Sequence, residues 1–161
     1  MQTSFTENQL KDKDNKTSET IIRKCVHCGM CNATCPTYGI NGEELEGPRG
    51  RIYLIKDMLE NKKPATKQIA KHIDSCLSCY SCMTTCPSGV NYMHLIDHGR
   101  NYVEETYKRP FFDRLFRNIL SFVLPRPKVF LLMALSSKII KPFSFLFPKF
   151  LKNALSLMPD K

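Results

Sequence analysis

The sequence predicts a mainly α-helical protein with one ordered domain over residues 20–108 and a basic, phenylalanine-rich, amphipathic helical segment over residues 109–161. Three observations support this: a cysteine-rich segment that occurs twice, apolar residues at helical spacing after each copy, and a change of composition from Phe111 onward. Residues 1–19 are mostly polar, and we expect them to form a mobile arm. A chain of 161 residues has room for this one domain and its two appendages.

The cysteine-rich segment spans residues 25–36 and recurs at residues 76–87. Both copies read C-x2-C-x2-C-x3-C-P, with a threonine before the last cysteine. This pattern is typical of [4Fe–4S] binding, and in two-cluster proteins the fourth cysteine of each run ligates the other cluster. The sequence therefore predicts two [4Fe–4S] clusters. The first would be held by Cys25, Cys28, Cys31 and Cys86, and the second by Cys76, Cys79, Cys82 and Cys35.

Zinc and disulfides are the alternatives for eight cysteines. Zinc sites often use C-x2-C pairs, but each copy here adds a third cysteine at the same spacing and ends in Cys-Pro. Disulfides need an oxidising compartment, and the N-terminus lacks the basic and apolar regions of a signal peptide. We therefore favour iron–sulfur clusters and expect a cytoplasmic protein, in which thiols stay reduced.

Helical patterns fill the space between and after the two copies. Apolar residues recur at helical spacing over residues 51–60, and Pro64 is placed to start a second helix that delivers Cys76. A third helix is expected over residues 94–107, where Arg109-Pro110 follows. The predicted fold class is thus an α-helical ferredoxin-like domain that binds two [4Fe–4S] clusters, followed by an amphipathic helical tail.

The tail after Phe111 has two interpretations. One helical face would carry Phe112, Leu115, Phe116, Ile119, Leu120 and Val123, with charged and amide side chains opposite. This face either packs on other domains or subunits, or lies at the inner surface of the cytoplasmic membrane with Lys and Arg toward lipid phosphates. No segment has the roughly 20 apolar residues of a membrane span, so any membrane contact is expected at the surface.

The net charge of +9 is not taken as a sign of nucleic-acid binding. Basic residues are spread along the chain, and two oxidised clusters of about −2 each would offset part of their charge. The sequence shows no phosphate-binding glycine loop and no Ser-His-Asp pattern, so we expect no catalytic residues and no substrate, flavin or nicotinamide site.

Three further residues have open roles. His27 is either a spacer in the first cysteine run or a hydrogen-bond partner that tunes a cluster. Arg49 and Arg51 are either solvated charges at a helix start or a positive surface near a cluster.

Five stretches carry a resemblance to a known family: residues 25–29, 32–38, 46–56, 84–90 and 124–127, of which Gly47-Pro48-Arg49-Gly50-Arg51 and Leu124-Pro125-Arg126-Pro127 are the most specific. The chain resembles, from Thr20 to its C-terminus, the iron–sulfur subunits of glycolate oxidase (glycolate dehydrogenase). These fall within a wider group with heterodisulfide-reductase-like and anaerobic glycerol-3-phosphate dehydrogenase subunits. Full-length members continue with two cysteine-rich CCG domains, and we expect this chain to correspond to the N-terminal two-cluster part without them.

The resemblance implies an oxidoreductase subunit that works in a complex. A flavoprotein subunit would oxidise glycolate to glyoxylate, and the two clusters would relay its electrons toward a quinone or another acceptor. The alternatives are an equivalent subunit of a lactate or anaerobic glycerol-3-phosphate dehydrogenase, or a heterodisulfide-reductase-like protein, because the substrate pocket lies on the partner.

Overall fold

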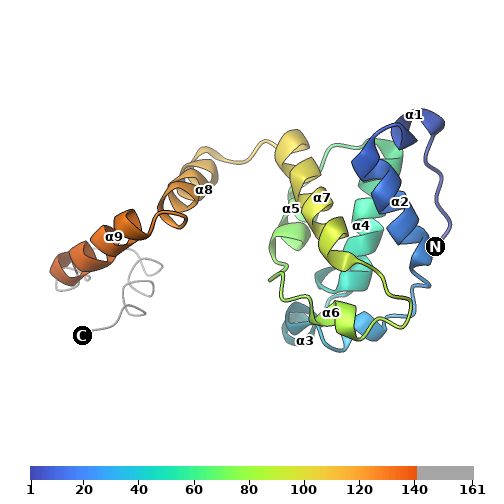
Figure 1. Cartoon of the computed structure of the whole chain (residues 1–161), viewed down its shortest axis with the longest axis horizontal. Helices are drawn as coiled ribbons and strands as arrows, with labels where there is room; N and C mark the ends of the chain where they lie inside the picture. The colour runs from blue at the N-terminus through green and yellow to red at the C-terminus, as the bar shows by residue number, and fades with distance from the viewer. Residues whose placement is uncertain (141–161) are drawn as a thin grey trace. The chain divides into compact units, whose positions relative to one another are not determined.

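The structure is a computed structural model that describes residues 1–140, with side chains through Leu135. Within this part the chain forms α-helices and short 3-10 turns and contains no strand, which confirms the predicted mainly α-helical class (Figure 1). The chain divides into two compact units, Met1–Lys108 and a second unit that begins at Arg109.

The first unit contains seven of the described helices. They are α1 (Glu7–Leu10), α2 (Lys13–Lys24), α3 (Pro36–Asn41), α4 (Pro48–Asn61), α5 (Lys67–Asp74), α6 (Ser81–Thr84) and α7 (Tyr92–Thr106), with 3-10 turns η1 (Met30–Asn32) and η2 (Glu44–Glu46). Local signals set several of their starts. Pro48 occupies the first turn of α4, where its missing N–H costs nothing. The side chains of Thr66 and Asn91 accept the backbone N–H of Ile69 and His94, and so cap α5 and α7.

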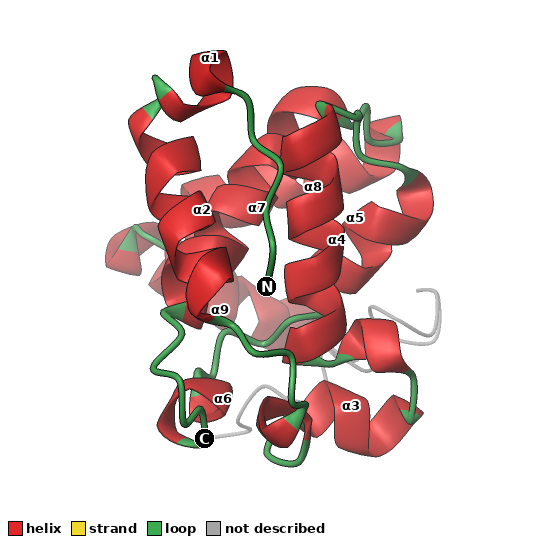
Figure 2. Ribbon diagram, turned by 90° about the vertical axis from the view of Figure 1, so that its right-hand side faces the viewer, coloured by secondary structure: helices red, strands yellow, loops and turns green. Residues whose placement is uncertain are grey.

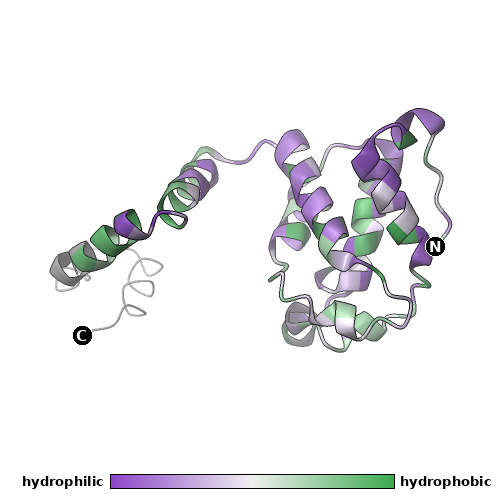
Figure 3. Cartoon of the chain, in the orientation of Figure 1, coloured by the Kyte–Doolittle hydropathy of each residue, from purple (hydrophilic) through white to green (hydrophobic). Residues whose placement is uncertain are grey.

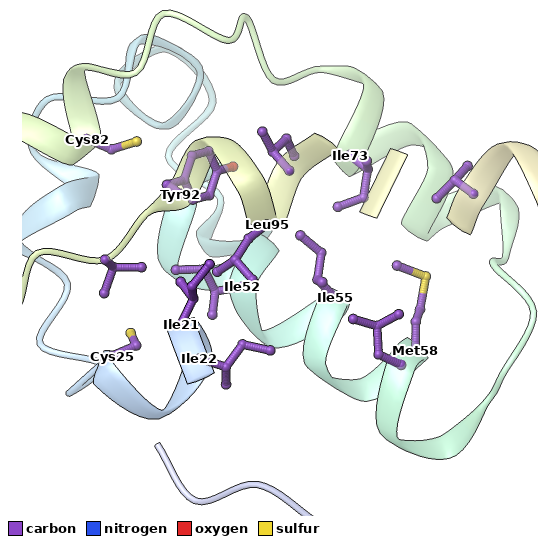
Figure 4. Packing of buried hydrophobic residues seen from close by; sticks show 14 of the residues in the cluster. Ile21, Ile22, Cys25, Ile52, Ile55, Met58, Ile73, Cys82, Tyr92 and Leu95 are labelled. Atoms are coloured by element: carbon purple, nitrogen blue, oxygen red, sulfur yellow. The ribbon is translucent and has the colours of Figure 1, made fainter. Parts of the chain in front are cut away.

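The apolar core lies between α2, α4, α5 and α7 (Figure 4). Ile22, Ile55, Ile73 and Leu95, one from each of these helices, are fully buried. Cys25 and Cys82 belong to the same buried cluster, at its edge. Figures 1 and 2 show from two directions that α3, α6 and the cysteine-bearing loops gather at one end of these helices. The helices therefore serve as a scaffold that brings the two cysteine runs together.

The N-terminal residues differ from the expected mobile arm over residues 1–19. Helix α2 already begins at Lys13, and Gln9 and Ser18 are buried. The side-chain amide of Gln9 donates to the carbonyl oxygens of Leu59 and Glu60, at 2.8 and 3.0 Å, at the C-terminal end of α4. Polar composition was a poor guide here, because these polar side chains satisfy backbone groups and partner side chains of the core helices.

The second unit contains α8 (Phe111–Val123) and α9 (Pro127–Ile140) in its described part. The predicted amphipathic helix corresponds to α8, in which hydrophobic and hydrophilic residues both occur (Figure 3). Its apolar side chains are largely exposed, Phe112 at 80%. Among the described residues no single helix has the length and apolar character to cross a membrane. The segments Phe111–Val123 and Pro127–Leu135 meet that test only together, with a bend of 111° between them. Residues 141–161 of the predicted tail lie outside the described residues.

Candidate metal centre

The eight cysteines come together around two cavities, and all eight thiols are free. The first cavity encloses about 430 Å³, part of it open to solvent, and its lining includes Cys25, Cys28, Cys31, Cys82 and Cys86. The second encloses about 300 Å³ and is bordered by Cys35, Cys76, Cys79 and Cys82. Each cavity thus gathers three cysteines of one run with the fourth cysteine of the other, and Cys82 borders both. The ligand assignment itself stays a prediction.

The two cysteine runs share a backbone conformation around their second cysteine, after which the first run forms the 3-10 turn η1 and the second the helix α6. The residues on either side of the second cysteine have a left-handed backbone in both copies. In the first run these are His27 and Gly29, with φ of 59° and 84°. In the second run they are Ser78 and Tyr80, with φ of 51° and 56°. A left-handed residue other than glycine costs about 1–2 kcal/mol, and such strain is found where function requires it. Alternating handedness turns successive N–H groups toward one side, which is a common arrangement around anionic iron–sulfur sites.

The threonines that precede the last cysteine of each run contact each other. The hydroxyl oxygens of Thr34 and Thr85 lie 3.1 Å apart and can share a hydrogen bond. These residues are 51 positions apart in the sequence, yet they occupy equivalent places in the two copies. This contact ties the two runs together beside the cavities.

Burial makes several thiols resist ionisation. Burial, and then the neighbouring thiols, raises the pKa of Cys31 to about 11 and that of Cys82 to about 12. Hydrogen bonds from Ser81 lower the pKa of the exposed Cys79. Metal ligands must be thiolates, so iron binding at these sites displaces protons that the folded protein otherwise holds tightly.

Arg51 is fully buried beside the second cavity, so the interpretation as a solvated charge is wrong for this residue. Its guanidinium donates to the carbonyl oxygen of His72 at 2.6 Å and to the carboxylate of Glu46 at 2.9 Å. Burial alone would raise the pKa of Glu46, but hydrogen bonds from Ser75 and His72 and the charge of Arg51 outweigh it and lower this pKa. The result is a buried ion pair next to the thiol of Cys35, which Arg51 Nη1 approaches at 3.9 Å.

Arg49 and His27 border the first cavity. The Arg49 side chain is 31% exposed and pairs with Glu44. The Nδ1 atom of His27 is buried and has no hydrogen-bond partner among the described residues. Burial, and then the charge of Arg49, lowers the pKa of His27, which favours the neutral imidazole.

The residues around the cavities fit iron–sulfur clusters. Thiols outnumber the other potential metal ligands in both linings, His27 in the first cavity being an imidazole, and neither lining includes a carboxylate from the described part of the chain. The remaining walls are largely apolar, with Ile52, Val90 and Pro48 among them. Glu43, Glu46 and His72 also come close enough to hold a metal ion, but Glu46 already neutralises Arg51.

Sequence reasoning missed some of these residues. Ser75 and Tyr92 carried no signal of their own, and Glu46 appeared only as the first residue of the stretch 46–56. Each gains its place through a contact between segments distant in sequence, such as the 2.7 Å contact between His72 Nδ1 and Glu46. The Gly-Pro-Arg-Gly-Arg stretch was the one visible indication of this network.

Comparison with known proteins identifies the cysteine-bearing region. Residues 21–90 match the model of the 4Fe-4S dicluster domain. The match favours [4Fe–4S] binding by the dicluster domain over zinc.

Named relatives extend the match beyond the dicluster domain. The chain is 48% identical over 143 residues to the glycolate oxidase iron-sulfur subunit of Escherichia coli K12, covering 89% of this chain and 35% of that protein. It is 32% identical over 117 residues to the probable glycolate oxidase iron-sulfur subunit of Bacillus subtilis 168, covering 70% and 26%. The succinate dehydrogenase iron-sulfur subunit of Paracoccus denitrificans is 28% identical over 76 residues, 44% of this chain and 29% of that protein.

The expected resemblance to glycolate oxidase iron–sulfur subunits is therefore confirmed. The chain spans about a third or less of the length of these relatives. No solved structure was found to match the chain.

Replacing Gly50 by alanine is predicted to destabilise the centre. A Cβ atom there would lie 2.2 Å from the carbonyl oxygen of Glu44, so η2 must move away from α4 and carry Glu46 away from Arg51. We expect a cost of about 1–3 kcal/mol, seen as a lower melting temperature and faster loss of cluster absorbance. The matched control is Gly39→Ala in α3, where nothing lies within 4 Å. Equal behaviour of the two variants would contradict this account of Gly50.

Proposed function

We propose that this chain is the electron-transfer part of a glycolate dehydrogenase (glycolate oxidase) complex. The observation that carries the proposal is the gathering of thiols from both cysteine runs around each cavity. The 48% identity to a glycolate oxidase iron-sulfur subunit supports the choice of complex. In this role the chain receives electrons from a flavoprotein subunit that oxidises glycolate to glyoxylate, and passes them toward a quinone or another acceptor.

Two [4Fe–4S] clusters are held, in this proposal, by thiolates that cross between the runs. The first set is Cys25, Cys28, Cys31 and Cys86, and the second set is Cys76, Cys79, Cys82 and Cys35. The membership of the two cavity linings supports this assignment.

The chain's own residues supply position and shielding. When bound, iron–sulfur clusters accept and donate single electrons. Cys82 borders both cavities, so the two sites adjoin and an electron has a short path between them. Cys28 and Cys79, one in each set, are exposed, so each site reaches the surface of the domain. One site can therefore face the donor and the other the acceptor.

Glycolate-dependent reduction tests the proposal. The chain is purified anaerobically, analysed for metal, and mixed with its flavoprotein partner. We expect about eight irons and eight sulfides per chain, and bleaching of the cluster absorbance on addition of glycolate. Lactate and glycerol 3-phosphate serve as the matched substrates, and bleaching by one of them alone would reassign the complex. Zinc in place of iron, or full electron delivery by the flavoprotein without this chain, would refute the relay role.

We further propose a cytoplasmic location with α8 against the inner face of the cytoplasmic membrane. The exposed apolar side chains of α8 and the basic residues Arg114 and Arg117 on the same helix support this. We expect the chain to co-sediment with vesicles rich in anionic lipid, and to co-sediment to a smaller extent with neutral vesicles.

Substituting an apolar side chain of α8 makes this membrane test more specific. Phe112→Glu should weaken vesicle binding, because Phe112 is the most exposed phenylalanine of α8 at 80%. Ile40→Glu, on a residue of the first unit that is 83% exposed, is the matched control and should bind as the parent chain does. Equal sedimentation with and without vesicles would instead support packing of α8 on another protein domain.

A further inference from the structure

The two proposed cluster sites are equally exposed, so exposure does not set them apart. In each set one cysteine is buried, two are intermediate and one is exposed. Reduction potentials of iron–sulfur clusters depend on exposure, charge and hydrogen bonds to sulfur. Because the exposure of the two sites is matched, the hydrogen-bond donors and charges that contact the thiolates determine which cluster has the higher reduction potential.

Two buried side chains donate to thiols of the second set. The phenol hydroxyl of Tyr92 points to Cys76 Sγ at 3.7 Å, and Arg51 Nη1 points to Cys35 Sγ at 3.9 Å. Tyr92 is 4% exposed and Arg51 1% exposed. Both interactions are therefore shielded from water, and one of them comes from a guanidinium that is paired with Glu46.

The guanidinium is the member of its ion pair that contacts the thiol. The carboxylate of Glu46 accepts hydrogen bonds from Ser75 and His72 as well as from Arg51. This carboxylate makes no hydrogen bond to a described cysteine, although the thiol of Cys35 also lies 3.7 Å from the backbone carbonyl oxygen of Glu46 and 3.2 Å from the hydroxyl of Thr37. The charge next to the second set is thus positive at the point of contact.

The thiols of the first set have weaker hydrogen-bond donors. The backbone N–H of Val90 donates to Cys86 Sγ at 3.5 Å, which is a neutral donor. Cys31 Sγ lies 3.9 Å from the side-chain oxygen of Asn32, an acceptor that does not favour a thiolate. Arg49 borders the first cavity, but its side chain is partly exposed and bound to Glu44, so solvent weakens its field.

We propose that Arg51 and Tyr92 make the cluster of Cys35, Cys76, Cys79 and Cys82 the one with the higher reduction potential, so that electrons enter at the first cluster and leave from the second. Reduction adds a negative charge to a cluster, and donors or cations at its thiolates stabilise that added charge. The inference rests on the proposed two-cluster relay and adds its direction.

A redox titration of the complete chain, purified anaerobically with its clusters, tests the order. Electron paramagnetic resonance follows the two reduced clusters as the potential is lowered. Cys28→Ser and Cys79→Ser assign the signals, because these cysteines are the exposed, equivalent members of the two sets. We expect the signal with the higher midpoint potential to be the one that Cys79→Ser alters. Equal midpoints, or a higher midpoint for the signal that Cys28→Ser alters, would overturn the proposal.

The variant Tyr92→Phe tests the cause. It removes the hydroxyl donor and keeps the ring, so only the higher midpoint should fall, by up to about tenfold in the reduction equilibrium, which is about 59 mV for one electron. Tyr102→Phe is the matched control on α7, since its hydroxyl makes no hydrogen bond to a described cysteine, and it should leave both midpoints unchanged. If Tyr92→Phe leaves the higher midpoint unchanged or shifts the other one, the proposal is wrong.

The two proposals fail in different ways. Absence of a second cluster in the metal analysis contradicts the two-cluster relay itself. A reversed order of midpoints with both clusters present leaves that relay intact and overturns only its direction.

Discussion

The whole arrangement depends on bringing two cysteine runs that lie 51 residues apart to the same place. The thiols around each cavity come from both runs, and Thr34 contacts Thr85 between them. Loop closure of this length is unfavourable in an unfolded chain. The helices between the runs offset that cost, because α4 and α5 bury Ile55, Met58 and Ile73 against α2 and α7. Metal binding further stabilises the folded arrangement, because it requires ligands from both cysteine runs to be in place together.

A buried ion pair links the scaffold to the second site. Arg51 extends from the start of α4 and meets Glu46 of η2, the carbonyl of His72 at the end of α5, and the thiol of Cys35. Breaking one partner of a buried pair costs about 3–5 kcal/mol, because the other charge is left without compensation. The pair therefore fixes the relative position of three segments and places a guanidinium beside a thiol of the second site. Gly50 serves the same purpose, since its lack of a side chain lets η2 approach α4.

The features that the sequence predicted correctly were those indicated by its repeat and by its hydrophobic periodicity. Two copies of one cysteine pattern indicated the metal type and the eight candidate ligands, and apolar spacing indicated the helices between them. It could not show that His27, Ser78 and Tyr80 adopt a left-handed backbone, because glycine is the usual sign of that conformation. It also missed the burial of Gln9 and Arg51, since a polar or charged side chain is buried only when distant partners meet it. The contrast between Tyr92 at one site and Asn32 at the other likewise depends on tertiary contacts alone.

The crossing of ligands between the two runs is tested most directly by the electron paramagnetic resonance spectrum of reduced Cys86→Ser. Cys86 belongs to the second run but borders the first cavity, together with Cys25, Cys28 and Cys31. The account predicts that this variant alters the same signal as Cys28→Ser and leaves the other cluster intact. If Cys86→Ser alters the signal of Cys79→Ser instead, each run holds its own cluster and the shared arrangement is wrong.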